Sequence, residues 1–376
     1  MIYIYYKVMD EIKQRIIDSY EQRGKTITTK SVDKYIKDIT TIRSLLGVEA
    51  TDNDISFLYN FDDVSAVIED MRGRKVVDGE KVMASPNTKR NYYQSVVSVF
   101  DALGDYKFIG KYQKKVNSYN KQYSKKLDEA NTSLTVENEN KLISYAELET
   151  IVNELTLRVR DVKDKLKTAE PVFTEEDLNA YQTLCLLRLY MVFPARNDFA
   201  TLLWGTESYL DKKDNNYLIL STQAQQKTSN MVINNYKTSG LYDTRILEFD
   251  KKNKLTGLLT QWRIVLRRYM KQFDKDMKIW AGSPVFYSRY IDIDNEKWIN
   301  SPMTSNKLSK YLSRFFQGKI GKPLGTTSIA KIVNSHQNKD NADAIKKNSK
   351  ARGTSVGTLS KVYTPVLPNQ THSNDA

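Results

Sequence analysis

Residues 351–363, with the sequence ARGTSVGTLSKVY, place a tyrosine nine residues after a threonine that lies in a Gly-Thr-Ser turn. Glycines and hydroxyl residues interrupt this stretch, so it is a poor helix interior. Tyr363 is then either one more core aromatic or a nucleophile. A tyrosine hydroxyl that attacks phosphorus forms a covalent intermediate, and cations must then stabilise the charge on the phosphate.

Two basic residues earlier in the chain are candidates to bind the phosphate or to donate a proton during such an attack. Arg196, in FPARNDFATLLW (193–204), follows an apolar helical stretch. It is either a surface arginine paired with Asp198 or a bidentate phosphate clamp. Lys237 lies in a turn between strand-like runs, where it is either exposed or a proton donor to a leaving oxygen, if nearby positive charge lowers its pKa. Lys227 is the competing lysine, ranked second because no strand directly precedes it.

Charge indicates the partner that these cations would meet. The net charge is +13, and the run from residue 106 to residue 126 contains seven lysines, four tyrosines and no acidic residue. Lysines neutralise phosphates, and interleaved rings offer flat contacts to sugar or base. The alternative is a solvated helix face, although such a face ordinarily includes glutamates. We predict phosphate contacts at Lys114, Lys115, Lys125 and Lys126, with Tyr106, Tyr112, Tyr119 and Tyr123 as the interleaved aromatics.

A small helical bundle is expected to carry the lysine run. Residues 31–46 and 88–103 both place apolar side chains three and four residues apart, which predicts helices, the first with Ser31 as its N-cap. Between them, residues 71–87 are predicted to form a charged, glycine-containing loop. We expect residues 1–126 to form an N-terminal DNA-binding domain. The acidic, polar stretch 127–143 then begins a linker that ends with a connecting helix at residue 170.

A second domain, residues 171–363, must position Arg196, Lys237 and Tyr363. Capping-box spacing at residues 144–147 and 174–177 predicts two helix starts. Short strand-like runs at 216–220, 231–236 and 245–249 follow, and helices return at 254–273, at 304–317 and around Lys331. The fold class is therefore mainly α with one small antiparallel β-sheet. Residues 364–376 are expected to form a short polar tail that is frayed.

Composition narrows the class of protein. A chain of 376 residues is too long for one ordinary core, so two domains are expected. The single Cys185 excludes an intramolecular disulfide and is typical of a reducing, intracellular compartment. Two histidines leave almost nothing for zinc, so we expect no metal and no cofactor. No apolar run approaches the roughly 18 residues of a membrane span, and the N-terminus is too polar for a signal peptide.

In this order the candidate residues resemble those of the tyrosine recombinases, the integrase-type enzymes that break and rejoin DNA. In that family an arginine follows an apolar helix, and a hairpin lysine, a His-x-x-Arg box, a Gly-His-Ser turn and a C-terminal tyrosine come after it. The matching positions are Arg196, Lys237, Ser328–Lys331, Gly353–Ser355 and Tyr363. The surrounding sequence is similar to recombinases of large DNA viruses and virophages, which implies the cytoplasm or a host nucleus.

The resemblance implies a helical core-binding domain, an α+β catalytic domain and double-stranded DNA as partner, bound by a homo-oligomer, a tetramer. It also implies that residues 364–376 dock on a neighbouring subunit, which is the alternative to a frayed tail. It implies that Tyr363 forms a 3′-phosphotyrosyl intermediate without metal. Arg196 and Lys331 would stabilise the transition state, and Lys237 would protonate the leaving 5′-oxygen. Thr354 would donate a hydrogen bond to the phosphate.

Three positions depart from the family pattern: Ser328 and Thr354 replace histidines, and Lys331 replaces an arginine. A lysine keeps the charge but loses the guanidinium fork. Arg352 either restores that fork, as a DNA contact, or forms an ordinary salt bridge. Two alternatives to an active recombinase therefore stay open: a DNA-binding protein with degraded catalysis, and an unrelated basic scaffold or RNA-binding protein. The last lacks a recognisable RNA module.

Overall fold

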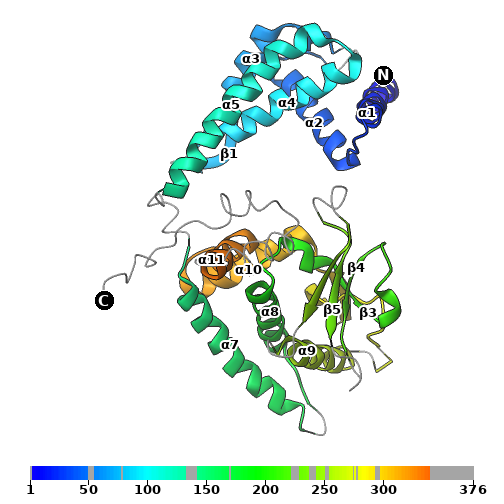
Figure 1. Ribbon diagram of the computed structural model, residues 1–376, viewed down its shortest axis with the longest axis vertical. Helices are drawn as coiled ribbons and strands as arrows, with labels where there is room; N and C mark the ends of the chain where they lie inside the picture. Colours follow the sequence, from blue (N-terminus) through cyan, green and yellow to red (C-terminus); the bar gives the residue numbers. More distant parts are fainter. Residues whose placement is uncertain are drawn as a thin grey trace. The chain divides into compact units, whose positions relative to one another are not determined.

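The computed structural model describes residues 2–49, 55–77, 79–132, 142–168, 171–221, 228–236, 243–249, 254–273, 275–276, 278–292 and 297–338. The chain divides into two compact units, Met1–Glu129 and Ala130–Ala376 (Figure 1). Several residues with predicted roles lie outside the described part: Lys227, Lys237, Arg352, Thr354, Tyr363 and the tail. The side chain of Lys126 also lies outside it.

The first unit packs helices around one apolar core, which includes Ile39, Val96, Phe100 and Tyr112. The helices predicted at 31–46 and 88–103 are confirmed as α2 and α4. The elements are α1 (Ile2–Gln22), α2 (Thr29–Leu45), η1 (Ser56–Tyr59), α3 (Phe61–Glu69), β1 (Arg72–Val77), β2 (Glu80–Met83), α4 (Pro86–Leu103) and α5 (Tyr106–Thr132).

Two expectations for this unit were wrong. The N-cap of α2 is Thr28, whose side chain accepts from the backbone N–H of Ser31, so Ser31 is the capped residue. Residues 71–87 are no loop, because β1 and β2 pair as an antiparallel hairpin. Helix α5 continues to Thr132, into the stretch that was predicted to begin the linker. The last residues of α5 are mostly polar, so no apolar spacing in the sequence marks where this helix ends.

The second unit surrounds one long apolar helix, α8, which contacts α7, α9 and α11. Both predicted capping boxes are confirmed, at Ser144 with Glu147 and at Thr174 with Asp177. The elements are α7 (Tyr145–Lys165), α8 (Glu175–Val192), η2 (Asn197–Thr201), β3 (Leu202–Gly205), η3 (Glu207–Tyr209), β4 (Asn216–Ile219), β5 (Ser229–Ile233), β6 (Arg245–Phe249), α9 (Leu255–Met270), β7 (Tyr287–Asp292), β8 (Lys297–Pro302), α10 (Ser305–Ile320) and α11 (Thr326–Asn338).

The sheet of this unit has the order β3-β4-β5-β6. Strands β4, β5 and β6 are antiparallel, as predicted, but β3 runs parallel to β4. The expected fold class, mainly α with small antiparallel β-structure, is confirmed, although β3 makes this sheet mixed and β7 with β8 forms a further hairpin. One face of the sheet packs on the helical core through Trp204, Leu218 and Met231, on the side where Figure 1 shows α8 and α9.

Candidate functional site

The end of α8 determines where Arg196 lies. Pro194 disfavours helical geometry in the residue before it, and Phe193 accordingly leaves the helix with φ −129° and ψ 87°. The buried Tyr190 then donates its hydroxyl to the backbone oxygen of Arg196 at 2.9 Å. Arg196 is therefore held in a fixed turn between α8 and η2. This agrees with the expectation that it directly follows an apolar helix.

The guanidinium of Arg196 is half-buried, and its Nη1 atom is buried without a hydrogen-bond partner among the described residues. The sequence suggested Asp198 as an ordinary ion-pair partner. That interpretation is wrong, because Asp198 Oδ2 binds Arg245 Nη2 at 2.7 Å, with both side chains buried. A buried cationic donor that lacks an acceptor is costly, so Arg196 has free capacity for an anion.

Asn197, the next residue, connects this turn to the starts of two helices. Its Nδ2 donates to the backbone oxygen of Ser305 at the start of α10, at 2.9 Å. Its Oδ1 accepts from the hydroxyl of Thr326, the first residue of α11. Helix N-termini carry partial positive charge and free N–H groups, so Arg196 belongs to an electropositive part of the unit. The sequence provided no signal for the Asn197–Thr326 link.

Helix α11 carries two further predicted residues. Ser328 and Lys331 are three residues apart, on the half-exposed side of a helix whose Ile329, Ala330 and Ile332 are fully buried. Lys331 lies about 8 Å along the helix from Thr326, at 1.5 Å per residue. The hydrogen bond between Asn197 and Thr326 therefore places the turn of Arg196 near the segment from Ser328 to Lys331.

A polar network at the end of the sheet reaches the chain just before Lys237. Asn216 Nδ2 donates to the backbone oxygens of Asp198, at 3.3 Å, and Asn235, at 3.0 Å. The Arg245 guanidinium, which binds Asp198, also lies 3.9 Å from the centre of the Tyr236 ring. Tyr236 directly precedes Lys237. The described residues up to Tyr236 are therefore held beside the segment that contains Arg196. Asn216 and Arg245 are structural residues that the sequence analysis missed.

The lysine run of the first unit forms a single stripe along α5. Five exposed lysines recur at spacings of four, three, seven and four residues, so they stay within about 80° of one another around the helix. They are Lys107, Lys111, Lys114, Lys121 and Lys125. Among the described residues, Lys107, Lys114 and Lys121 form no ion pair, which leaves their charges available for phosphate.

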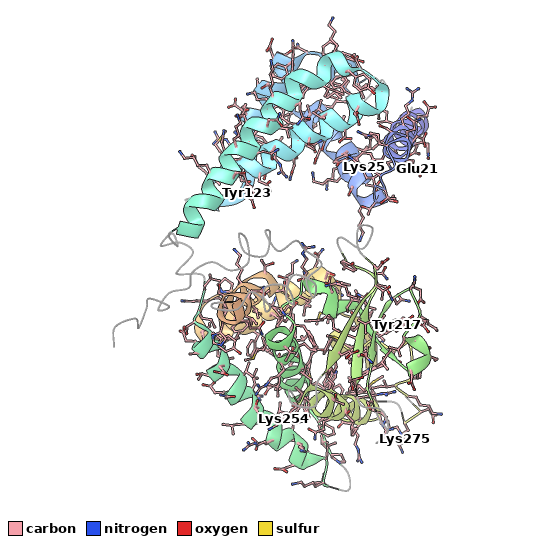
Figure 2. The ribbon with its side chains drawn as sticks, viewed as in Figure 1. Glu21, Lys25, Tyr123, Tyr217, Lys254 and Lys275 are labelled. Atoms are coloured by element: carbon pink, nitrogen blue, oxygen red, sulfur yellow. The ribbon has the colours of Figure 1, made fainter. Side chains whose placement is uncertain are left out.

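The aromatics of α5 divide between core and surface. Tyr106 and Tyr123 are exposed, and Tyr123 is labelled in Figure 2. Tyr112 is fully buried and donates to the backbone oxygen of Leu58 at 2.6 Å. Tyr119 is also buried and donates to Glu69 at 2.5 Å. The interpretation of all four tyrosines as nucleic-acid contacts is therefore wrong for these two, which lie on the opposite side from the stripe.

Lys115, one of the predicted DNA contacts, also turns away from the stripe. Its Nζ lies 3.0 Å from Glu69 Oε1, and Glu69 accepts a further hydrogen bond from Tyr93 at 3.0 Å. Burial by itself would raise the pKa of the Glu69 carboxyl, but hydrogen bonds from Tyr119, Lys115 and Tyr93 hold it at about 2. Lys115 thus joins α5 to the end of α3.

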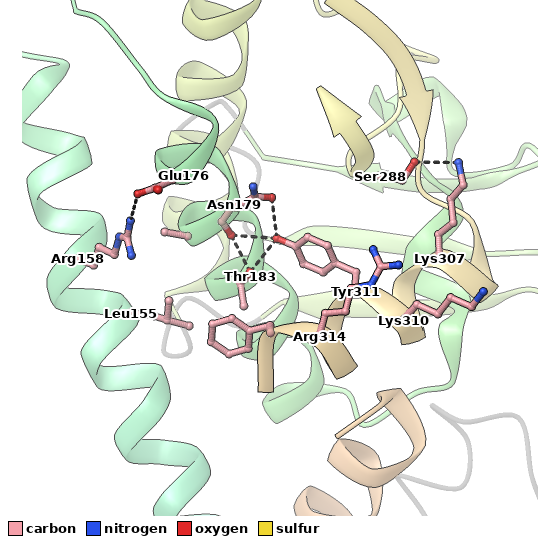
Figure 3. A pocket seen from close by; sticks show the side chains of 12 residues that line it. Leu155, Arg158, Glu176, Asn179, Thr183, Ser288, Lys307, Lys310, Tyr311 and Arg314 are labelled. Atoms are coloured by element: carbon pink, nitrogen blue, oxygen red, sulfur yellow. Dashed lines mark hydrogen bonds and ion pairs between the residues drawn. The ribbon is translucent and has the colours of Figure 1, made fainter. Parts of the chain in front are cut away.

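A pocket of about 750 Å³ opens between α7, α8 and α10 of the second unit (Figure 3). Its charged lining residues are Arg158, Glu176, Lys307, Lys310 and Arg314. Two of the cations already have partners, since Arg158 lies 3.1 Å from Glu176 and Lys307 donates to Ser288 at 3.0 Å. The pocket is thus moderately basic and separate from the turn of Arg196.

Tyr311, which lines this pocket, is a poor candidate for a nucleophile. Burial raises the pKa of its hydroxyl to about 12. The hydroxyl donates to the backbone oxygen of Asn179 at 3.1 Å and lies 2.9 Å from Thr183 Oγ1, as Figure 3 shows. A hydroxyl held in this way packs α10 on α8 and serves structure.

Comparison with protein-family models, with curated proteins and with solved structures gives no match for this chain. In the part of the chain that the structure describes, no three His, Cys, Asp or Glu side chains gather where they could hold a metal ion. None of the described helices is long and apolar enough to cross a membrane. Function must therefore be inferred from the side chains themselves.

Proposed function

We propose that this protein binds double-stranded DNA and breaks and rejoins it as a tyrosine recombinase, with Tyr363 as nucleophile. One observation carries the proposal: Arg196 has a buried Nη1 atom without a described partner, although the nearest acid in the sequence is two residues away. A phosphate oxygen is the acceptor that such a planar guanidinium binds best.

The surroundings of Arg196 support the same assignment. Asn197 bonds its turn to the starts of α10 and α11, and α11 carries Lys331 about 8 Å further on. Asn216 bonds the same turn to the chain that leads to Lys237. The turn of Arg196 is thus hydrogen-bonded to α11 and to the described residues that precede position 237, although these segments are far apart in the sequence.

In the proposed reaction the Tyr363 oxygen attacks a backbone phosphorus and the bond from phosphorus to the 5′-oxygen breaks. Lys237 gives its proton to that leaving oxygen, and the tyrosine proton passes to water or to the phosphate. Arg196 and Lys331 stabilise the extra negative charge of the five-coordinate transition state. One phosphoester replaces another, so the 5′-hydroxyl can later reverse the step and rejoin the strand.

The test is covalent trapping on a pool of nicked duplexes of randomised sequence. A nick beside the cleaved phosphate lets a short fragment diffuse away, so the protein should remain joined to DNA through denaturing electrophoresis. Tyr363→Phe should abolish this adduct and leave duplex binding within about twofold, because the hydroxyl supplies chemistry and little binding energy.

Tyr311→Phe is the matched control, because it removes a tyrosine hydroxyl from the same unit at a position with a structural role. It should form the adduct at a rate close to that of the wild type. An adduct that survives Tyr363→Phe would show that another tyrosine is the nucleophile and that the match to the family is wrong.

A second candidate is a DNA-binding protein that has lost cleavage. The observation that favours it is the half-exposed side of α11, where Ser328 and Lys331 stand in place of the histidine and arginine of the family. Under this alternative the wild type binds duplex DNA and forms no adduct. Lys331→Arg combined with Thr354→His would then be expected to restore cleavage.

A further inference from the structure

The hairpin of β1 and β2 is the part of the first unit that neither the lysine stripe nor the core explains. Its strands pair at Arg72 with Met83 and at Val76 with Lys81. Directly paired residues of antiparallel strands point to the same side, and so do residues two apart. Lys81 and Met83 are two residues apart on β2, so they and their partners Val76 and Arg72 form one face of the hairpin, on either side of a bulge in β1. We call it the outer face.

The outer face is open to solvent, whereas the base of the hairpin is packed on the unit. Val76 is 54% exposed and Met83 43%, and Arg72 and Lys81 are also exposed. Met71 and Ala84, which join the hairpin to α3 and α4, are 8% and 5% exposed and share a backbone hydrogen bond of 2.8 Å. Two apolar side chains and two cations are thus presented together on a solvent-exposed β surface.

The Glu69 cluster fixes this hairpin to α5. Glu69 is the last residue of α3, three residues before β1 begins. Its carboxylate binds Tyr119 and Lys115 of α5 and Tyr93 of α4. The hairpin base is therefore tied to the middle of the helix that carries the lysine stripe, and in Figure 1 β1 lies beside α4 and α5.

Charge complementarity indicates the occupant of the outer face. Residues 72–126, from the hairpin to the end of the lysine run, contain 13 lysines and arginines against four acidic residues. Residues 1–71 of the same unit contain nine against 13. The hairpin thus belongs to the basic part of its unit, which favours a polyanion over a second copy of the chain.

We propose that the outer face of the β1–β2 hairpin enters the major groove of duplex DNA. A two-stranded ribbon has the width that this groove admits. Arg72 and Lys81 bind phosphates or guanine edges there, and Val76 and Met83 contact thymine methyl groups. The inference rests on the proposed function only for its ligand, duplex DNA, and is independent of cleavage.

The test compares two charge-matched double variants of the full-length protein. Arg72→Gln with Lys81→Gln should weaken binding to duplex DNA about tenfold and lower the slope of log affinity against log salt by about 0.9 for each phosphate that is no longer neutralised. Lys30→Gln with Lys37→Gln removes the same charge from exposed positions of α2 and should change neither value appreciably. All four positions are exposed, and thermal unfolding checks that each variant is folded.

A second measurement separates groove binding from charge alone. Replacing thymine by uracil removes the methyl groups from the major groove and should weaken wild-type binding several-fold. Val76→Ser with Met83→Ser should remove this sensitivity without changing the salt slope.

The outcomes distinguish this inference from the proposed function. Equal affinities for the two charge variants, on DNA that the wild type binds, would overturn the hairpin inference and leave recombination standing. Loss of affinity and of uracil sensitivity in a protein that forms no covalent adduct would support the hairpin and overturn cleavage. A wild type that binds no duplex would overturn both.

Discussion

The lysine stripe of α5 and the arginine after α8 carry the same sign of charge in opposite surroundings. The stripe holds five exposed lysines on one side of a helix. Arg196 is a single half-buried guanidinium, positioned by Tyr190 and followed by an asparagine that bonds two helix starts. Both can bind phosphate, but a charge in water is screened more strongly than a half-buried one, so their interaction energies with phosphate differ.

Exposed cations are hydrated and screened, so each contributes little energy and all respond to salt. Under the proposed function, such a stripe binds duplex DNA of any sequence. A half-buried guanidinium is screened less and can favour the transition state, in which the phosphate carries extra charge, over the ground state. Under the proposed function, binding and chemistry therefore belong to different units, and mutations can separate them.

The largest expected effect is on the free energy of unfolding, and it distinguishes Arg196 from Arg245. Arg245→Ala leaves the buried carboxylate of Asp198 without its cation, which should destabilise the second unit by about 3–5 kcal/mol. Arg196→Ala removes a buried nitrogen that has no described partner, so its free energy of unfolding should change by less than about 1 kcal/mol.

Urea unfolding followed by tryptophan fluorescence makes this measurement, because all four tryptophans lie in the second unit. Comparable destabilisation by the two substitutions would mean that Arg196 has a structural role like that of Arg245.

Arg196 should show its main effect in catalysis. Arg196→Ala should slow adduct formation by about 10²–10³-fold, the range for removal of an oxyanion donor, and should leave the affinity for intact duplex within about threefold. Arg196→Lys should recover only part of the rate, because an ammonium lacks the planar fork. Single-turnover trapping gives the rate, and a parallel drop in affinity would place Arg196 among the binding cations.

The stripe should show the reverse behaviour. Replacing Lys107, Lys111, Lys114 and Lys121 with glutamine should flatten the salt dependence of binding by up to about 0.9 per lysine, and cleavage at saturating protein should persist. Lys115→Gln is the control, because its Nζ is engaged by Glu69. If Lys115→Gln alone changes the slope as much as the four substitutions together, the stripe is a solvated face.

Local signals in the sequence predicted the local structure well. The capping boxes at Ser144 and Thr174 need only four consecutive residues, and both are present. The spacing of the lysines along α5 is also readable, and the same periodicity places Tyr112 and Tyr119 on the core side. The hairpin was missed because its strands are charged and lack alternating apolar residues, although Gly79, at φ 82°, follows Asp78 as a turn signal.

Contacts between distant residues could not be predicted in the same way. Asp198 is two residues from Arg196, which favoured their pairing, yet its partner Arg245 is 47 residues away. Thr326 meets Asn197 across 129 residues, and β3 pairs with β4 in parallel without any pattern that announces it. A single sequence provides residue types for the candidate site, whereas the choice of partner depends on how the elements pack.

The smallest expected effect is one of pH on the first unit, and it tests whether Lys115 is structural. The pKa of Glu69 is held at about 2, below its ordinary value of 4.5. The unfolded chain therefore takes up this proton first as the pH falls. The stabilisation is fully present above about pH 4.5 and is lost progressively as the pH approaches 2.

Circular dichroism of the full chain should report this loss as helix unfolding, while tryptophan fluorescence follows the second unit alone. Glu69→Gln should reduce the stability of the first unit at neutral pH. It should also weaken the dependence of its unfolding on acid pH, here called the acid limb, which dichroism follows. The fluorescence transition of the second unit should stay in place. Lys115→Gln should weaken the acid limb partly, because the hydrogen bonds from Tyr119 and Tyr93 remain. An acid limb that both substitutions leave unchanged would mean that the carboxylate contributes nothing to the unit, and Lys115 would then be available to bind DNA with the rest of α5.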